Sequence, residues 1–503
     1  MFEVRKFCVI RADATTQLGG GHIFRCLVLA DALAAKGWTC VFATDERSVE
    51  IVPHLKDSGH GLLHLNCDEA SETNAIKDAF PAGCDLLVVD HYLRDASFET
   101  ALRSWAGMIL VVEDLLDRQH VCDFILDQTH AERSTDKAAS ASNPIELIGH
   151  EFALLRPRFS RRRRTGGLPV RHFPPQRILI QVGASDISGL ASPLVSLALK
   201  AFPNATLTVL LGSSSKSLPA MRQLSQLYDR QVDLQIDVRN VDELMSQADF
   251  MIGAGGSACW EACCMGLPMA LVMAAENQQP VIDQLSHAGA AISLGSSEVF
   301  NHQGDVALLA LTSLDSEKVS AMSANAARIC DGLGVYRVLL ALQPEIAADD
   351  VVVTLRSVRG SDGPLLLSWQ SDPSTRRYFR DSTVPDAGTH YRWLANRLAS
   401  DKGPFCIILC NNKPCGMIRL DRNYERDLSE RFAAYEVSLI IAPDQRGKGL
   451  ATAALRAASR LVDGADLVAH ILAQNLSSVS AFTKAGFVPE SSDWYRLKAQ
   501  GDD

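Results

Sequence analysis

Residues 7–37 constrain the fold more than any other part of the sequence. A short apolar run over 7–10 predicts a buried strand, and three consecutive glycines follow at 19–21. Apolar residues at helical spacing then occupy 23–34, before a helix stop signal at Gly37. The order strand, glycine loop and helix lets the backbone approach a ligand closely and directs the positive end of a helix dipole at an anion. This stretch therefore predicts an α/β unit with an anion site.

His22 lies at the mouth of this loop, directly after Gly21. Its imidazole is the one side chain there that can take up a proton near neutral pH. We therefore expect a ligand that contacts the loop at Gly21 to lie opposite His22. A helix-capping or buried structural histidine is the alternative interpretation.

Length and composition narrow the class of protein. A chain of 503 residues predicts two to four domains, and a net charge of −10 argues against a nucleic-acid partner. No apolar run reaches the roughly 18–20 residues of a membrane span, and no signal peptide is recognised, so we expect no membrane partner. The 13 cysteines lack zinc-site spacing, and many lie inside apolar runs. They fit reduced core thiols, a cytoplasmic location and no metal requirement.

Strand-like and helix-like stretches alternate up to about residue 159, which predicts a Rossmann-like domain over residues 1–160. Most of the expected strands end in acidic residues. These are Asp45, Asp90, Glu113, Asp114 and Asp127. Because the carboxyl ends of strands hold the ligand crevice of an open α/β sheet, these side chains are placed to line a site. Solvated strand ends are the alternative.

The four arginines at 161–164 and the glycines after them predict a linker, with a basic phosphate-binding arm as the alternative. A second Rossmann-like domain is expected over residues 161–345. In it, an apolar run at 250–254 enters another glycine loop, and a helix is expected at 258–265. A polar, proline-bearing stretch then marks a boundary before a last domain at 351–503.

The second glycine loop predicts a diphosphate site, because it can direct backbone N–H groups at the phosphates. A glutamate one helical turn later comes within reach of a ribose diol, and two amide side chains further on can bind sugar hydroxyls. The candidate substrate-binding residues here are Gly255, Gly256, Ser257, Glu261, Asn277 and Gln278. One glycine loop alone is a weak signal, but the combination favours a nucleotide-sugar site between two α/β domains.

Several segments carry motifs of a known family. They are Arg11-Ala12-Asp13, Gly19-x-Gly21-His22-x-x-Arg25-Cys26-Leu27, Val88-Val89-Asp90-His91-Tyr92, Leu154 to Phe159, Gly253 to Ser257, Trp260-Glu261, Gly266-Leu267-Pro268 and Glu276-Asn277-Gln278. Over about residues 7–342, this set resembles the UDP-2,4-diacetamido-2,4,6-trideoxy-β-L-altropyranose hydrolases of pseudaminic acid biosynthesis. The resemblance implies two Rossmann-like domains of glycosyltransferase-B type, with water in place of the acceptor sugar.

The same resemblance implies a role for individual residues. His22 would take a proton from the water that attacks the anomeric carbon. The second glycine loop would hold the charge of the departing diphosphate. Tyr92 and Asn277 would line the sugar pocket, and Glu261 would hold the ribose.

The last 150 residues carry a different phosphate-binding pattern. A strand is expected over 436–441, followed by a loop of small residues and a long helix, so that backbone N–H groups can wrap a pyrophosphate. With the downstream residues 473–487, this pattern resembles the GNAT N-acetyltransferases over about 351–498, an α+β fold. The resemblance implies acetyl-CoA as co-substrate. Its expected contacts are Ile441, Gln445, Arg446, Gly447, Gly449, Ala451 and Asn475.

Two residues of this domain bear on acid–base chemistry. Glu436, on the strand before the loop, is the candidate base for the incoming amine, with an ordinary strand-end carboxylate as the alternative. Many members of the family carry a tyrosine as general acid where this chain has Phe482. Either another group protonates the leaving thiolate, or the thiolate leaves unassisted.

Together these patterns predict a bifunctional enzyme of pseudaminic acid biosynthesis that takes a UDP-sugar and acetyl-CoA. It would acetylate the 4-amino group of a UDP-sugar precursor and release UDP from the diacetamido product. Two alternatives keep the acetyltransferase. In one, residues 7–342 form a nucleotide-sugar glycosyltransferase, and in the other they form a non-catalytic nucleotide-sugar-binding module.

Overall fold

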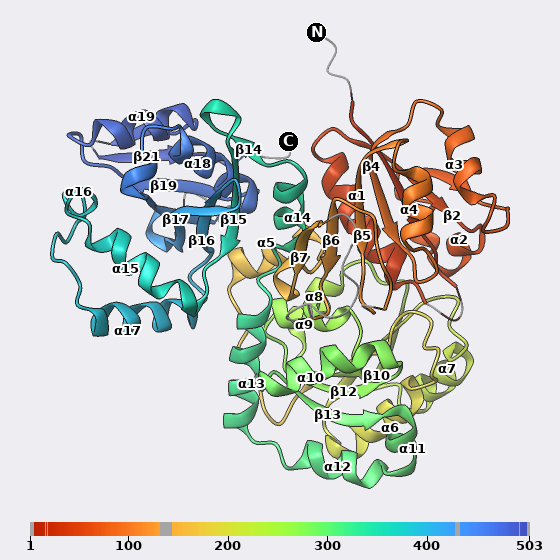
Figure 1. Cartoon of the computed structure of the whole chain (residues 1–503). Helices are drawn as coiled ribbons and strands as arrows, with labels where there is room; N and C mark the ends of the chain where they lie inside the picture. The colour runs from red at the N-terminus through yellow and green to blue at the C-terminus, as the bar shows by residue number, and fades with distance from the viewer. Residues whose placement is uncertain are drawn as a thin grey trace. The chain divides into compact units, whose positions relative to one another are not determined.

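The computed structural model describes residues 5–15, 17, 19–115, 117–130, 143–427, 433–491 and 493–499. The chain forms two compact units, Met1–Val335 (unit 1) and Tyr336–Asp503 (unit 2). Unit 1 holds two parallel sheets, and unit 2 holds one mixed sheet (Figure 1). In the described part of the chain, no helix is both long and apolar enough to cross a membrane.

The first sheet has seven parallel strands in the order β3-β2-β1-β4-β5-β6-β7. They are β1 Phe7–Ala12, β2 Thr39–Thr44, β3 Gly61–His64, β4 Cys84–Asp90, β5 Ala106–Val112, β6 Phe124–Asp127 and β7 Ile145–Ile148. The strand order reverses between β1 and β4, so the carboxyl ends of these two strands form the switch point where open α/β sheets bind ligands.

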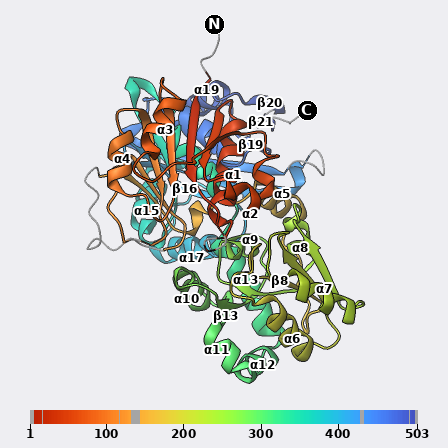
Figure 2. The same cartoon turned by 90° about the vertical axis from the view of Figure 1, so that its right-hand side faces the viewer.

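Helices cover both faces of this sheet. They are α1 Gly21–Ala34, α2 Arg47–Ile51, α3 Glu72–Ala79 and α4 Ala96–Leu102. Ile76, Phe98 and Leu102 of α3 and α4 join one buried cluster with strand residues, whereas α1 lies on the other side of the strands (Figure 2). The expected strand, glycine loop and helix are thus β1, the loop before Gly21 and α1, which confirms the opening pattern.

The second sheet has six parallel strands in the order β10-β9-β8-β11-β12-β13. They are β8 Arg177–Gln181, β9 Thr206–Leu211, β10 Val232–Ile236, β11 Phe250–Ala254, β12 Met269–Met273 and β13 Ala291–Ser296. The helices after β7 are α5 Pro157–Gly166, α6 Ala191–Ala201, α7 Leu218–Leu227, α8 Val241–Gln247, α9 Ala258–Cys264, α10 Gln279–His287, α11 Ser297–His302, α12 Gly304–Thr312, α13 Ser316–Ile329 and α14 Gly334–Leu342. The second glycine loop joins β11 to α9, as expected.

The prediction of a linker at residues 161–164 was wrong. These arginines lie in α5, which begins with a proline in its first turn. Arg163 is buried and donates to the backbone carbonyls of Ala327 and Cys330, at 2.8 and 2.7 Å. Arg162 pairs with Asp242 at 2.8 Å. Backbone carbonyls and a carboxylate far along the sequence therefore satisfy guanidinium groups that composition alone assigned to solvent.

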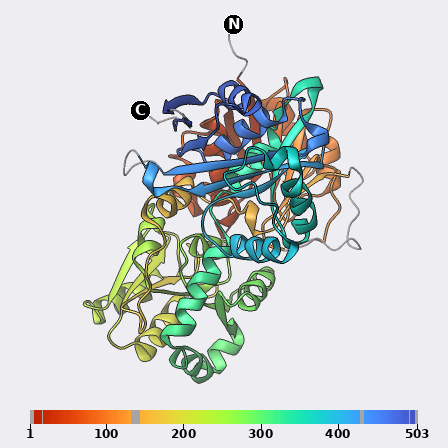
Figure 3. The ribbon, with the colours of Figure 1, turned by 90° about the vertical axis from the view of Figure 1, so that its left-hand side faces the viewer.

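The sheet of unit 2 has the strand order β14-β15-β16-β17-β18-β19-β21-β20. Its strands are β14 Glu345–Ile346, β15 Val352–Ser357, β16 Phe405–Cys410, β17 Lys413–Arg422, β18 Ala434–Ile441, β19 Asp466–His470, β20 Val488–Ser491 and β21 Trp494–Leu497. Its helices are α15 Gly363–Ser371, α16 Pro373–Arg376, α17 Ala387–Leu398, α18 Leu450–Leu461 and α19 Leu476–Lys484. Figure 3 shows the blue strands with the teal and light-blue helices of residues 363–398 on one side.

The α/β class, with two Rossmann-like parts and a GNAT-like sheet, is confirmed. The domain limits 1–160, 161–345 and 351–503 stay predictions. The sheet of unit 2 already begins at Glu345. All 13 cysteines lie in the described residues, none forms a disulfide, and most are buried, as expected of core thiols.

Candidate active sites

His22 and Asp90 form a buried pair at the switch point of the first sheet. Nδ1 of His22 lies 2.6 Å from Oδ1 of Asp90, and both side chains are buried. Nη2 of Arg25 also lies 3.1 Å from Nδ1, but it already donates to Oδ1 of Asp90 at 2.5 Å. The shorter contact of Nδ1 with a carboxylate, which can only accept, therefore places a proton on Nδ1 and leaves the lone pair of the neutral ring on Nε2. Burial raises the pKa of Asp90, but the Arg25 guanidinium and the imidazole outweigh burial and hold the pKa well below its usual range. The pair thus presents a basic nitrogen that is oriented by an anion.

Arg25, one turn after His22 on α1, ties this pair to the end of β5. Its Nε donates to Oδ2 of Asp90 at 2.6 Å, and its Nη1 donates to Oδ2 of Asp114 at 2.9 Å. One guanidinium therefore joins two strand-end carboxylates. The sequence placed both aspartates at strand ends but gave Arg25 no role beyond the family motif.

Tyr92 connects His22 to the second half of unit 1. The two rings meet edge to face, with centroids 4.6 Å apart. The phenol donates to Asp114 at 3.3 Å and accepts a hydrogen bond from Nδ2 of Asn277 at 2.9 Å. Burial and the Asp114 charge raise the pKa of Tyr92, which keeps the phenol protonated. The structure thus brings His22, Tyr92 and Asn277 together, although 185 residues separate the last two.

Arg118 supports the segment that carries Tyr92. Its Nη1 donates to the backbone carbonyls of His91 and Arg94, at 2.7 and 2.9 Å, and its Nη2 donates to Glu113 at 2.6 Å. The segment after β4 is not a helix or strand, and the His91 carbonyl accepts one backbone bond, from the Arg94 N–H at 3.3 Å. The bonds from Arg118 add side-chain support to this turn. Nothing in the sequence around Arg118 indicated this role.

His120 lies behind this support and bridges two buried carboxylates. Its Nδ1 is 2.6 Å from Glu99, and its Nε2 is 2.8 Å from Glu113. Burial lowers the pKa of His120, but the hydrogen bonds to Glu113 and Glu99 outweigh burial and raise it to about 9. At neutral pH the imidazolium of His120 therefore neutralises part of the negative charge of Glu99 and Glu113.

The second glycine loop is shaped by packing. A Cβ at Gly255 would lie 2.5 Å from Cγ1 of Ile282, whereas Cβ atoms at Gly256 and Gly21 would meet nothing within 4 Å. Open space at Gly256 and Gly21 is what a close ligand needs. Ser257 precedes the first residue of α9. The loop geometry is therefore compatible with phosphate binding, which stays a prediction.

The remaining predicted contacts of unit 1 have protein partners. Glu261 pairs with Arg156 at 3.2 Å, and burial raises its pKa while Arg156 opposes the rise. Gln278 accepts a hydrogen bond from the Ala274 N–H at 2.9 Å. This bond orients the Gln278 side chain with its amide N–H groups directed away from that backbone.

In unit 2, β18 and β19 separate at Glu436. The two parallel strands pair only from Ala434 to Glu436, although β18 continues to Ile441 and β19 to His470. Among the described residues, no strand therefore pairs with this side of β18 beyond Glu436, and its backbone groups are open to a ligand that can pair with them. Ile441 is the last residue of β18.

The loop after β18 has the backbone expected of a phosphate loop. Gly447 and Gly449 have φ values of +80° and +74°, which a side chain would disfavour, and Gly449 directly precedes α18. Arg446 donates to the hydroxyls of Ser374 and Thr375, at 2.6 and 2.5 Å. Arg446 is thus partly engaged by α16.

The other predicted cofactor contacts lie around this loop. Gln445 accepts a hydrogen bond from Lys448 at 2.8 Å, and Ala451 lies in the first turn of α18. Asn475 caps α19 by accepting from the Ser478 N–H at 3.2 Å, which leaves its amide N–H groups for a ligand. Phe482 is buried edge to face against Phe487, with centroids 4.9 Å apart, so its ring is part of the core.

Glu436 lies at the point of separation with two partners. Arg380 contacts Oε1 at 2.7 Å, and Asn423 donates to Oε2 at 3.3 Å. The carboxylate is partly exposed and is oriented by both groups. Its assignment as the amine base stays a prediction.

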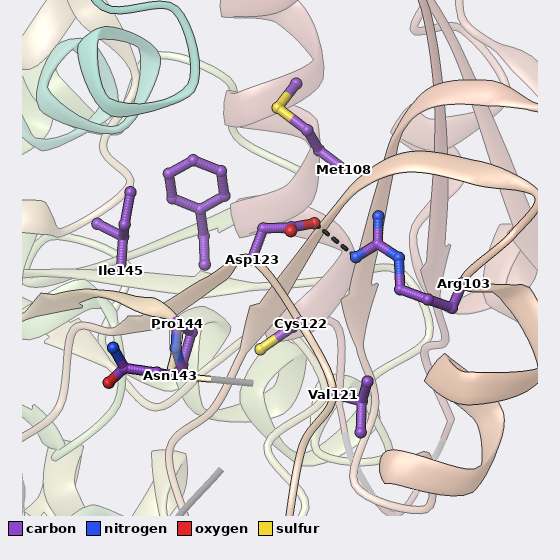
Figure 4. Close-up of a pocket in the computed structure, with 9 residues that line it drawn as sticks. Arg103, Met108, Val121, Cys122, Asp123, Asn143, Pro144 and Ile145 are labelled. Atoms are coloured by element: carbon purple, nitrogen blue, oxygen red, sulfur yellow. Dashed lines mark hydrogen bonds and ion pairs between the residues drawn. The ribbon is translucent and has the colours of Figure 1, made fainter. Parts of the chain in front are cut away.

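A pocket of about 500 Å³ lies at the opposite edge of the first sheet. It is bordered by the first residues of β6 and β7 and by the Arg103–Asp123 ion pair (Figure 4). Because Asp90 and Asp114 follow the carboxyl ends of their strands, this pocket is not part of the candidate site. In the described part of the chain, no group of three or more His, Cys, Asp or Glu side chains is arranged to hold a metal ion.

Comparisons with known proteins agree with the division of the chain into unit 1 and unit 2. Residues 353–488 match the acetyltransferase (GNAT) domain family. The UDP-2,4-diacetamido-2,4,6-trideoxy-beta-L-altropyranose hydrolase of Campylobacter jejuni is 23% identical over 286 residues, which cover 56% of this chain and 96% of that protein. The chain thus joins a hydrolase-like region to a GNAT domain. The GNAT match supports acetyl-CoA as co-substrate, and the two similarities support a sugar-modifying fusion enzyme.

Two further comparisons extend the likeness without naming an activity for this chain. An uncharacterized protein of Methanocaldococcus jannaschii is 19% identical over 398 residues, which cover 77% of this chain and 78% of that protein. Among solved structures, MurG of Acinetobacter baumannii has a TM-score of 0.45 and 16% identity, and the match covers 67% of this chain and 99% of that one.

Proposed function

We propose that the chain is a bifunctional enzyme that acetylates the 4-amino group of a UDP-sugar and hydrolyses UDP from UDP-2,4-diacetamido-2,4,6-trideoxy-β-L-altropyranose. The observation that carries the hydrolase assignment is the Asp90–His22 pair, whose Tyr92 neighbour binds Asn277. Similarity to the Campylobacter hydrolase supports the choice of substrate.

In the proposed hydrolysis, water attacks the anomeric carbon while its proton passes to Nε2 of His22. The carbon–oxygen bond to the diphosphate breaks, and UDP leaves with the electron pair. Asp90 fixes the ring and stabilises the imidazolium that forms, as a carboxylate partner of a general base does. Tyr92 and Asn277 are proposed to hold the sugar, and residues 255–257 the diphosphate.

In the proposed acetylation, the amine nitrogen of the sugar attacks the thioester carbon of acetyl-CoA. The carbon–sulfur bond breaks, the CoA thiolate leaves, and Glu436 accepts the proton of the amine. The open side of β18 and the loop from Arg446 to Ala451 are proposed to hold the cofactor. The GNAT match supports this half of the proposal.

A pair of glutamine substitutions tests the role of His22. H22Q should lower UDP release by more than about 10²-fold, because the amide cannot act as a base, while acetyl transfer by the same chain is unchanged. H60Q is the matched control. His60 contacts Asp31, a residue of the helix α1 that also carries His22, at 2.8 Å, but His60 does not contact the candidate site. UDP release and product masses are measured with the 4-amino UDP-sugar and acetyl-CoA. UDP release by H22Q at the wild-type rate would contradict the assignment of His22 as the base. If the wild-type protein leaves the UDP-sugar intact when no acceptor is added, residues 7–342 form a glycosyltransferase instead.

A further inference from the structure

Two arginines of unit 2 lie over one tryptophan ring beside Glu436. The guanidinium carbon of Arg426 is 4.0 Å from the centroid of the Trp494 ring, and that of Arg380 is 5.7 Å from it. Arg380 also contacts Glu436 at 2.7 Å. Two cations and an aromatic ring therefore adjoin the candidate base of the acetyltransferase.

Both guanidinium groups retain unused N–H donors. Arg380 donates through Nη2 to Glu436, and Arg426 donates through Nη1 to Glu490 at a long 3.4 Å. Within the described ranges, the other nitrogens of these two side chains have no hydrogen-bond partner, and the side chains are 61% and 31% exposed. A guanidinium that lies over an aromatic ring keeps its N–H edge available for paired bonds to phosphate oxygens.

The negative net charge of the chain bears on what these two arginines can bind. With a net charge of −10, the protein as a whole repels an anionic substrate. An acceptor that carries phosphate therefore needs local cations. The glycine loop at 447–449, which we assign to the CoA pyrophosphate, does not include Arg380 or Arg426, so these two are available for the second substrate.

We propose that Arg380 and Arg426 bind the diphosphate of a nucleotide-linked amine and thereby select a phosphate-bearing acceptor over a neutral amino sugar. This inference rests on the proposed acetylation and names the residues that recognise its acceptor. Phosphate competes with Glu436 for Arg380, which releases a carboxylate oxygen to receive the proton of the amine. Acceptor binding thus prepares the base.

Steady-state acetyl transfer tests the selection. R380M and R426M should each raise KM for the 4-amino UDP-sugar by about 10-fold or more, because each removes a charge-assisted contact to phosphate. KM for acetyl-CoA should stay within about threefold, since the cofactor loop is untouched. R392M is the matched control, because Arg392 is an exposed arginine of α17 that donates only to Thr389, at 3.4 Å, among the described residues. A KM shift in R392M as large as in the other two would overturn the proposal.

A count of UDP sites separates this inference from the proposed hydrolase. Calorimetric titration of the full chain with UDP, at saturating CoA, should give one site fewer in the R380M/R426M double variant than in wild type and R392M. The count is independent of UDP release, because any UDP site in unit 1 remains in all three proteins. A double variant that binds as many UDP molecules as wild type, with the same affinity, overturns the inference even if both activities are present.

Discussion

At the scale of single residues, the site in unit 1 depends on which nitrogen of His22 is basic. The 2.6 Å contact with Asp90 places the proton on Nδ1, and Arg25 keeps Asp90 charged. The imidazole is therefore held in the tautomer that a base needs. This arrangement makes Asp90, which the sequence placed at a strand end and in a family motif without a role of its own, as important as the histidine.

D90N should lower kcat for UDP release by about 10²–10⁴-fold, because an amide can donate to Nδ1 and so favour the tautomer with a protonated Nε2. D45N is the control, since Asp45 also follows a strand but pairs with the exposed Arg47. Both rates are compared with acetyl transfer by the same protein. A D90N rate within about threefold of wild type would show that the carboxylate does not set the tautomer.

At the scale of elements, the segment after β4 is held by a side chain in addition to one backbone bond, from the Arg94 N–H to the His91 carbonyl at 3.3 Å. Arg118 bonds two of its carbonyls and Glu113. R118K should therefore lower UDP release, because one ammonium cannot reproduce the forked contacts that hold Tyr92 against His22. We expect a loss of about 10-fold or more in kcat with a smaller change in KM, since the change affects positioning more than binding.

R103K is the matched control for this change. Arg103 likewise joins one carboxylate, Asp123, to two backbone carbonyls, those of Ala106 and Gly107, but at the opposite edge of the sheet (Figure 4). The R103K variant should leave the rate of UDP release unchanged within about threefold. Equal losses in the two variants would mean that any weakened arginine contact in this sheet lowers activity.

At the scale of the whole molecule, the two units should respond differently to pH. The pKa of His120 is raised in the folded state to about 9 from an ordinary value of 6.5. Its pairing with Glu99 and Glu113 therefore contributes stability that is fully present below about pH 6.5 and is lost as the pH rises through about 9. His120 belongs to unit 1, so unit 2 should not share this dependence.

The test compares the free energy of unfolding of wild type and H120Q across this range. The difference for unit 1 should fall by about 3 kcal/mol between pH 6.5 and pH 9.5, which is the value of a 2.5-unit shift. Denaturant unfolding that resolves the two units gives unit 2 as the internal reference. A difference that is constant with pH would show that the imidazolium is not paired as described.

The sequence by itself determined the local elements and their chemistry. The strand, glycine loop and helix at residues 7–34, the loop at 253–257 and the loop before α18 are where the pattern predicted them, because hydrophobic period and glycine φ preferences act over a few residues. The sequence also placed Asp90 and Asp114 at strand ends. The composition of residues 161–164 wrongly predicted a linker, because partners of these arginines lie up to 167 residues away in the sequence.

Only the tertiary structure decided which of these groups meet. Asp90 is 68 residues from His22, and the pair forms because β1 and β4 are neighbours in a parallel sheet. Tyr92 and Asn277 come from different sheets, and the contact of Arg380 with Glu436 spans 56 residues. No local period encodes these distances, because they follow from strand order and from the packing of whole elements.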